Sequence, residues 1–142
     1  MLNVIYRPCS AETDGAYIRP NHRPNWYSKE KCYKSLIDSI INSKDIINTF
    51  FIFFDGNLNG TFFNYIQSTF KLLSENDIKF EVFPSNFGSV LGSIKNATEF
   101  GCQFDMATYF VEDDYLHLPD SIQKMYNTCL LYTSDAADDT PC

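Results

Sequence analysis

The chain has 142 residues, of which 44% are hydrophobic and 20% charged, which suits one globular domain and argues against a disordered tail. Its formal net charge of −7 lacks the basic surface that binding to a phosphate backbone requires, so we expect no nucleic-acid partner. No apolar run could span a bilayer, no secretory signal opens the chain, and the five cysteines match no zinc or disulfide framework, so we expect a reduced, cytoplasmic protein without a transmembrane segment.

The first half of the chain predicts two strand–helix units. Residues 2–6 form a short apolar strand, and residues 7–27 form a long loop interrupted by Pro and Gly. Residues 49–54 are an unbroken β-branched and aromatic run that predicts the second strand. Each strand is followed by apolar residues at helical spacing, which are Cys32, Leu36, Ile37, Ile40 and Ile41 after a possible Ser28 cap, and then Phe62, Ile66, Phe70 and Leu73.

The second half predicts two further units of the same kind. Residues 79–83 and 107–111 are the third and fourth strands. Their helices are marked by Leu91, Ile94 and Ala97 before Gly101, and by Ile122, Met125 and Tyr126 after Pro119. Four strand–helix units in succession predict an α/β fold with a parallel sheet and right-handed crossovers. We expect the strand order 3-2-1-4, with residues 2–6 central and helices on both faces.

Polar residues follow the end of every predicted strand. In an open parallel sheet, ligands bind outside the carboxyl ends of the strands, so these residues are the candidate site. They are Arg7 after the first strand, Asp55 after the second, Asn86 and Gly88 after the third, and Glu112, Asp113 and Asp114 after the fourth. Three adjacent carboxylates repel one another, and a bound Mg²⁺ or Mn²⁺ would relieve that cost. The alternative is a solvated acidic turn at the start of the last helix.

The acidic segment carries a resemblance to a known family. Residues 109–120, Tyr-Phe-Val-Glu-Asp-Asp-Tyr-Leu-His-Leu-Pro-Asp, resemble the acidic motif of GT-A fold glycosyltransferases, in the Glu-Asp-Asp variant of N-acetylglucosaminyltransferase-like enzymes. The run Asn86-Phe-Gly-Ser89 is similar to the Asn-x-Gly segment of family-2-like transferases, whereas Asp55 matches their post-strand-two aspartate only loosely. The resemblance covers nearly all of residues 2–127. It implies the Rossmann-like, nucleotide-binding half of a GT-A domain.

The resemblance also implies a function. The enzyme would bind a nucleoside-diphosphate sugar with Mn²⁺ or Mg²⁺ and transfer the sugar to a glycan or another hydroxyl acceptor. It assigns Asp114 as the metal ligand, Glu112 and Asp113 as contacts to ribose, sugar or the metal's waters, Asp55 as facing the nucleobase, Arg7 as lying beside the nucleotide, and Asn86 and Gly88 as further donor-binding residues. The family's acceptor site and catalytic base come later in the chain and are not identified here.

Two other functions remain open at this stage. A nucleotidyltransferase uses a similar sheet but needs a Gly-rich, basic phosphate loop after the first strand, where residues 7–27 contain only Gly15. A non-enzymatic α/β interaction domain would leave the acidic turn solvated. Metal-dependent nucleotide binding would distinguish this last alternative from the two enzymes. His117, near the acidic motif, is expected to be an ordinary surface residue rather than a ligand.

The end of the chain differs in composition from the rest. Residues 129–139, Cys-Leu-Leu-Tyr-Thr-Ser-Asp-Ala-Ala-Asp-Asp, resemble the conceptual translation of a common transposase sequencing adapter. The alternative is a natural acidic tail. We expect residues 1–128 to be the nucleotide-sugar-binding part of a GT-A domain and residues 129–142 to be a non-native tail. We then also expect a truncated protein that lacks its acceptor half and transfers no sugar alone.

Overall fold

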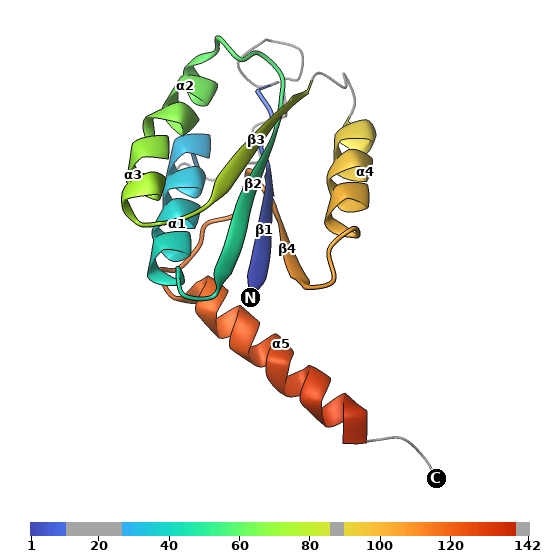
Figure 1. The fold of residues 1–142 in the computed structure, drawn as a ribbon. Coiled ribbons are helices and arrows are strands. Elements are labelled where there is room, and N and C mark those ends of the chain that lie inside the picture. The colour runs from blue at the N-terminus through green and yellow to red at the C-terminus, as the bar shows by residue number, and fades with distance from the viewer. Residues whose placement is uncertain (11–26, 86–89, 139–142) are drawn as a thin grey trace.

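A four-stranded parallel sheet forms the centre of the computed structural model, which describes residues 1–10, 27–85 and 90–138 (Figure 1). The strands are β1 Leu2–Arg7, β2 Ile47–Asp55, β3 Phe80–Ser85 and β4 Ala107–Glu112. The helices are α1 Lys29–Asn42, α2 Thr61–Ser68, α3 Phe70–Glu75, α4 Val90–Gly101 and α5 Ser121–Asp138. The sheet order is β3-β2-β1-β4 and every pair is parallel, which confirms the predicted α/β class, strand order and central first strand.

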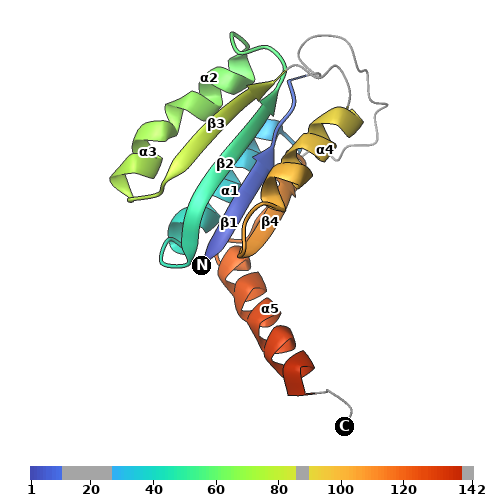
Figure 2. The ribbon, with the colours of Figure 1, turned by 45° about the vertical axis from the view of Figure 1, so that its right-hand side comes forward.

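The helices divide between the two faces of the sheet. Helices α1, α2 and α3 lie on one face and α4 lies on the other (Figure 2). Because successive side chains of a strand point to opposite faces, Val4 and Tyr6 of β1 enter the larger apolar cluster beneath α1 and α2, whereas Ile5 enters the smaller cluster beneath α4. This alternation continues to the carboxyl ends of the strands, and it decides which face each charged residue there occupies.

The predicted start of α1 is confirmed at Ser28. The Ser28 side chain accepts a hydrogen bond from the backbone N–H of Lys31 at 3.0 Å, which is the ordinary N-cap arrangement. From that end the helix packs Tyr33, Leu36 and Ile40 against the sheet. The cap places the first residue of α1 close to the end of β1, where the candidate site lies.

The helix predicted after β2 is interrupted in the structure. It ends at Ser68 and resumes as α3 at Phe70, with Thr69 between the two pieces. The Thr69 hydroxyl bonds the carbonyl of Ile66 at 2.8 Å and also lies 2.8 Å from the hydroxyl of Tyr33. A hydroxyl that bonds the preceding turn bends a helix, and apolar periodicity does not reveal this effect.

Helix α4 covers less of the sheet than its apolar residues predict. Among the apolar residues that marked this helix, Ala97 is buried, but Leu91 is 80% exposed. The helix packs on β1 and β2, and Gly101 allows a close approach, since a Cβ there would lie 2.4 Å from the ring of Phe110. Phe110 on β4 nevertheless remains 43% exposed, because α4 packs mainly on β1 and β2. Among the described residues, β4 pairs only with β1 and forms an edge of the sheet.

Helix α5 packs on the domain through its first turns. It begins at Ser121, slightly later than the predicted start at Pro119, and buries Ile122 with Met125 and Tyr126 beside it. Cys129 and Leu130 are exposed, and the helix continues away from the sheet (Figures 1 and 2). Within the part of the chain that the structure describes, no helix has both the length and the apolar character needed to cross a membrane.

Removing the end of the chain is expected to cost little stability. Ending the chain after residue 128 should lower the free energy of unfolding by less than about 1 kcal/mol, because the part of α5 that packs on the core is retained. Ile122→Ala in the full chain should cost about 2–5 kcal/mol, since Ile122 is fully buried. Urea denaturation at one pH measures both values. A loss of several kcal/mol on removing residues 129–142 would show that this segment stabilises the domain.

Candidate functional site

Charged residues end three of the four strands at one edge of the sheet. Arg7 is the last residue of β1, Asp55 of β2 and Glu112 of β4, and Asp114 follows β4 by two residues. Strand β1 has β2 on one side and β4 on the other, while α1 and α4 lie on opposite faces, so the crevice between β1 and β4 is the topological switch point. The predicted site residues Asn86 and Gly88 lie outside the described residues.

The segment after β1 is tied to the end of β2. The backbone N–H of Ser10 donates to the carbonyl of Asp55 at 2.9 Å, and the N–H of Asp55 donates to the carbonyl of Pro8 at 3.0 Å. The Ser10 hydroxyl accepts from the N–H of Asn57 at 2.8 Å. Gly56 makes this approach possible, since it has a φ of +129° and a Cβ added to it would lie 1.8 Å from the Ser10 hydroxyl. The two strand ends therefore form one connected structure.

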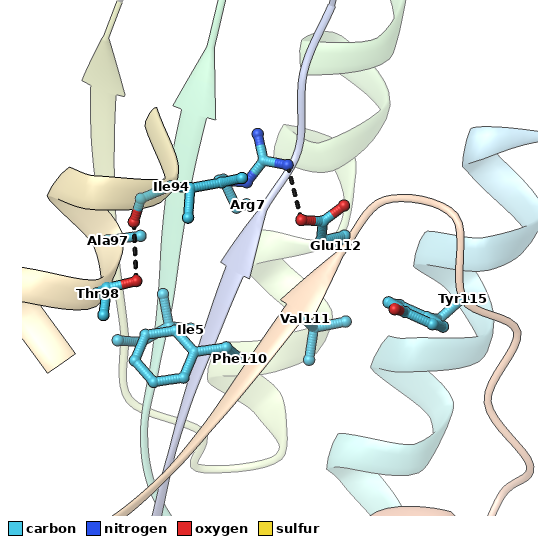
Figure 3. A pocket seen from close by; sticks show the side chains of 9 residues that line it. All are labelled: Ile5, Arg7, Ile94, Ala97, Thr98, Phe110, Val111, Glu112 and Tyr115. Carbon is cyan, nitrogen blue, oxygen red and sulfur yellow. Dashed lines mark hydrogen bonds and ion pairs between the residues drawn. The ribbon is translucent and has the colours of Figure 1, made fainter. Parts of the chain in front are cut away.

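Arg7 and Glu112 form an ion pair on the α4 face of this edge. Arg7 Nη2 lies 3.0 Å from Glu112 Oε1, and the Arg7 side chain is largely buried while that of Glu112 is half exposed. The pair stands at one end of a cavity of about 230 Å³ between α4 and β4 (Figure 3). The remaining lining is mostly apolar and consists of Ile5, Ile94, Ala97, Thr98, Phe110, Val111 and Tyr115.

Asp113 lies on the opposite face, against the start of α1. Its Oδ2 is 2.8 Å from Nζ of Lys29 and accepts a hydrogen bond from the backbone N–H of Cys9 at 3.2 Å. Lys29 also donates to the carbonyl of Cys9, and its ammonium lies 5.6 Å from the ring centroid of Phe62. Burial raises the pKa of the Tyr6 hydroxyl, and the negative charges of Asp113 and Asp114 raise it further.

The three adjacent acids therefore do not form a single cluster, which differs from the sequence expectation. The pleat of β4 sends Glu112 and Asp113 to opposite faces, and Arg7 and Lys29 neutralise them one by one. Among the described residues, no three His, Cys, Asp or Glu side chains lie close enough to hold a metal ion together. The repulsion on which the metal expectation was based is thus relieved by protein cations.

Asp114 is the carboxylate whose position still fits a divalent cation. It is exposed at the carboxyl edge, directly after the two paired acids. Mg²⁺ and Mn²⁺ prefer oxygen ligands, and Mg²⁺ in particular is commonly held by one or two protein carboxylates together with substrate phosphates and water. Asp114 is thus the exposed carboxylate at this edge that could ligate such a cation, and the described residues do not form an all-protein metal cage.

Two residues of this site were not identified from the sequence. Lys29 reads as an ordinary helix residue and Cys9 as a loop residue, yet both bond Asp113. The only signal in the sequence is a cation in the first turn of a helix, which opposes the helix dipole, and Lys31 carries the same signal, so it does not single out Lys29. Cys9 contributes only backbone groups to its hydrogen bonds with Asp113 and Lys29, and the sequence gives no signal for them.

His117 connects the segment after the acidic motif to α1. Its backbone N–H donates to the hydroxyl of Ser35 at 2.9 Å, and its Nε2 lies 3.2 Å from the Tyr109 hydroxyl. The ring also lines a second cavity of about 210 Å³ between β4 and α5. His117 is buried, which corrects the expectation that it is an ordinary surface residue.

His117 is expected to make the protein less stable in acid. Desolvation lowers the pKa of its imidazole, and a backbone interaction with Tyr115 opposes part of that change. The unfolded chain takes up this proton near pH 6.5, whereas the folded protein takes it up only at lower pH, so the free energy of unfolding should fall as the pH drops below about 6.5. His117→Gln should reduce this slope between about pH 5 and 7 in urea denaturation. An unchanged slope would contradict the prediction.

Comparison with known proteins identifies no relative of the chain. No protein-family model, curated protein or solved structure matches the chain. The function is therefore inferred from the charged residues at the carboxyl edge of the sheet.

Proposed function

We propose that the chain binds a nucleoside-diphosphate sugar together with Mn²⁺ or Mg²⁺ and serves as the donor-binding part of a GT-A type glycosyltransferase, which transfers the sugar to a glycan or another hydroxyl acceptor. One observation carries the proposal: Arg7 and the acidic motif end the two strands that flank the switch point of a 3-2-1-4 parallel sheet, and Asp55 ends the neighbouring strand β2 at the same edge. Ligands bind at this position in open α/β sheets. The resemblance of residues 109–120 to the GT-A acidic motif supports the choice of ligand.

Each residue of the edge has a role in this proposal. Asp114 would hold the cation, which when bound stabilises the negative charge of the departing diphosphate. Asp55, at the end of β2, would face the nucleobase. Glu112 and Asp113 would accept hydrogen bonds from ribose or sugar hydroxyls with the carboxylate oxygens that do not bond Arg7 and Lys29.

Arg7 is suited to a position beside the nucleotide. Its side chain is only 10% exposed and its guanidinium is already oriented by Glu112, so little rotamer entropy is lost when a ligand binds. A guanidinium presents five donors in a fixed fork, so Arg7 can keep its bond to Glu112 and still donate to a phosphate oxygen. The Arg7–Glu112 pair would thereby supply both a donor and an acceptor at one point of the crevice.

Calorimetry with a panel of nucleoside diphosphates tests the proposal. The 142-residue chain should bind at least one of them in Mn²⁺, and binding should weaken markedly when EDTA removes the cation. A matched nucleoside triphosphate should bind no more tightly than the preferred diphosphate. A clear preference for triphosphates would instead favour a nucleotidyltransferase, and the absence of any metal-dependent nucleotide binding would indicate an interaction domain.

A further inference from the structure

Lys29 occupies a position that is unfavourable for a lysine in isolation. It is the first residue of α1, and its side chain is only 10% exposed. A cation near the N-terminus of a helix opposes the helix dipole, and burial adds a desolvation cost to any charge. Lys31, two residues further along the same turn, is exposed, so its charge remains hydrated. Both lysines oppose the dipole, but Lys29 alone is buried, so its contacts must offset a desolvation cost that the exposed Lys31 does not incur.

Those contacts join three separate parts of the carboxyl edge. Nζ of Lys29 bonds the Asp113 carboxylate after β4 and the Cys9 carbonyl after β1. Cys9 in turn donates its N–H to the same Asp113 oxygen and pairs as a β-bridge with Asp55 of β2. One ammonium thus connects the start of α1 with both sides of the switch point between β1 and β4.

We propose that Lys29 is a positioning residue of the nucleotide site, which acts by fixing the Asp113 carboxylate and the Cys9 segment rather than by contacting the ligand. This inference rests on the proposed function. Lys29 and the Cys9 N–H both bond Oδ2, so Oδ1 is the oxygen with which Asp113 accepts a ligand hydroxyl. Without Lys29, the carboxylate loses its main charge partner and the Cys9 segment loses its connection to α1.

A double-mutant cycle on nucleotide affinity tests this role. Lys29→Met keeps the length of the side chain, remains compatible with the neighbouring Phe62 ring and removes the ammonium. Lys29→Met and Asp113→Asn should each weaken binding of the Mn²⁺–nucleoside diphosphate by about 10–100-fold, the usual loss when a residue supporting a metal or substrate ligand is removed. The double variant should bind no more weakly than Asp113→Asn alone, because Lys29 acts through Asp113.

Two results of the cycle would overturn the proposal. If the two losses multiply in the double variant, Lys29 does not act through Asp113 and the proposal is wrong. If Lys29→Met binds like wild type, Lys29 has no part in the site. Lys31→Met is the matched control, because it removes the same charge from the same turn and should leave affinity within about twofold. Should Lys29→Met fail to fold, Lys29→Gln keeps a donor for the Cys9 carbonyl and must show the same non-additivity.

A second measurement separates this inference from the proposed function. Hydrogen exchange of the Cys9 amide, followed by NMR without nucleotide, should accelerate in Lys29→Met and in Asp113→Asn, while the Val4 amide in the centre of the sheet remains protected. Unchanged exchange at Cys9 would overturn the positioning role even if nucleotide binds. A wild-type chain that binds no nucleotide in Mn²⁺, with exchange at Cys9 still dependent on Lys29, would contradict the proposed function instead.

Discussion

Asp114→Asn is expected to weaken metal-dependent binding of a nucleoside diphosphate by at least about tenfold. The substitution keeps the size of the side chain but removes the charge, and removing even an indirect partner of a bound metal commonly costs 10–100-fold in metal affinity or activity. Among the three adjacent acids, Asp114 is the exposed one, and the other two are paired with Arg7 and Lys29. Its loss should therefore not be compensated by its neighbours.

Asp120→Asn provides the matched control for this prediction. Asp120 is also exposed and lies only six positions after Asp114 in the chain. It pairs with Lys124 at 2.7 Å. The adjacent Pro119 accepts a hydrogen bond from Asn42 in the last turn of α1, so Asp120 lies away from the carboxyl edge. Both variants remove one surface negative charge, so their general electrostatic effects are similar. Calorimetry in Mn²⁺ and in EDTA should show a loss for Asp114→Asn in Mn²⁺ alone. Equal affinity of Asp114→Asn and wild type in Mn²⁺ would exclude Asp114 as the metal ligand.

The fold could be predicted from the sequence because its signals are local and repeated. An apolar run such as residues 49–54, followed by a turn and then by apolar residues at helical spacing, occurs four times, and right-handed crossovers leave few arrangements of such units. The sheet order then follows from the usual pattern of open α/β sheets. Where the prediction differs from the structure, the helix expected after β2 is interrupted at Thr69, whose hydroxyl bonds the Ile66 carbonyl and lies against the Tyr33 hydroxyl, and apolar spacing indicates neither contact.

The site could be predicted only in its position along the sheet edge. Strand ends place Arg7, Asp55 and the acidic motif at that edge, but the pleat distributes neighbouring acids over two faces. The partners of those acids depend on which helix covers each face. The pairing of Asp113 with Lys29 joins residues 84 positions apart in the sequence, and no local pattern indicates it. The sequence therefore shows which charged residues lie at the edge, but the partner of each acid is decided by how the helices pack on the sheet.

Gly56→Ala is expected to lower the free energy of unfolding by about 2–4 kcal/mol and to reduce nucleotide binding. Gly56 has a φ of +129°, in a region that non-glycine residues adopt only with a strain of about 1–3 kcal/mol. A Cβ there would also lie 1.8 Å from the hydroxyl and 2.9 Å from the Cβ of Ser10, so Ser10 would have to move. That movement breaks the hydrogen bond from the Asn57 N–H to the Ser10 hydroxyl and displaces the segment that carries Cys9.

Two further variants separate the parts of this effect. Gly60→Ala is the control, because Gly60 has an ordinary φ of −76° at the N-cap of α2 and its substitution should cost no more than about 1 kcal/mol. Ser10→Gly combined with Gly56→Ala removes the clashing side chain, so it should recover the part of the loss due to the clash while the backbone strain remains. Urea denaturation measures the stability of each variant and calorimetry its nucleotide affinity. Wild-type stability of Gly56→Ala would contradict the close approach of β2 to Ser10, and a stability loss with unchanged nucleotide affinity would show that the Ser10 segment does not shape the nucleotide site.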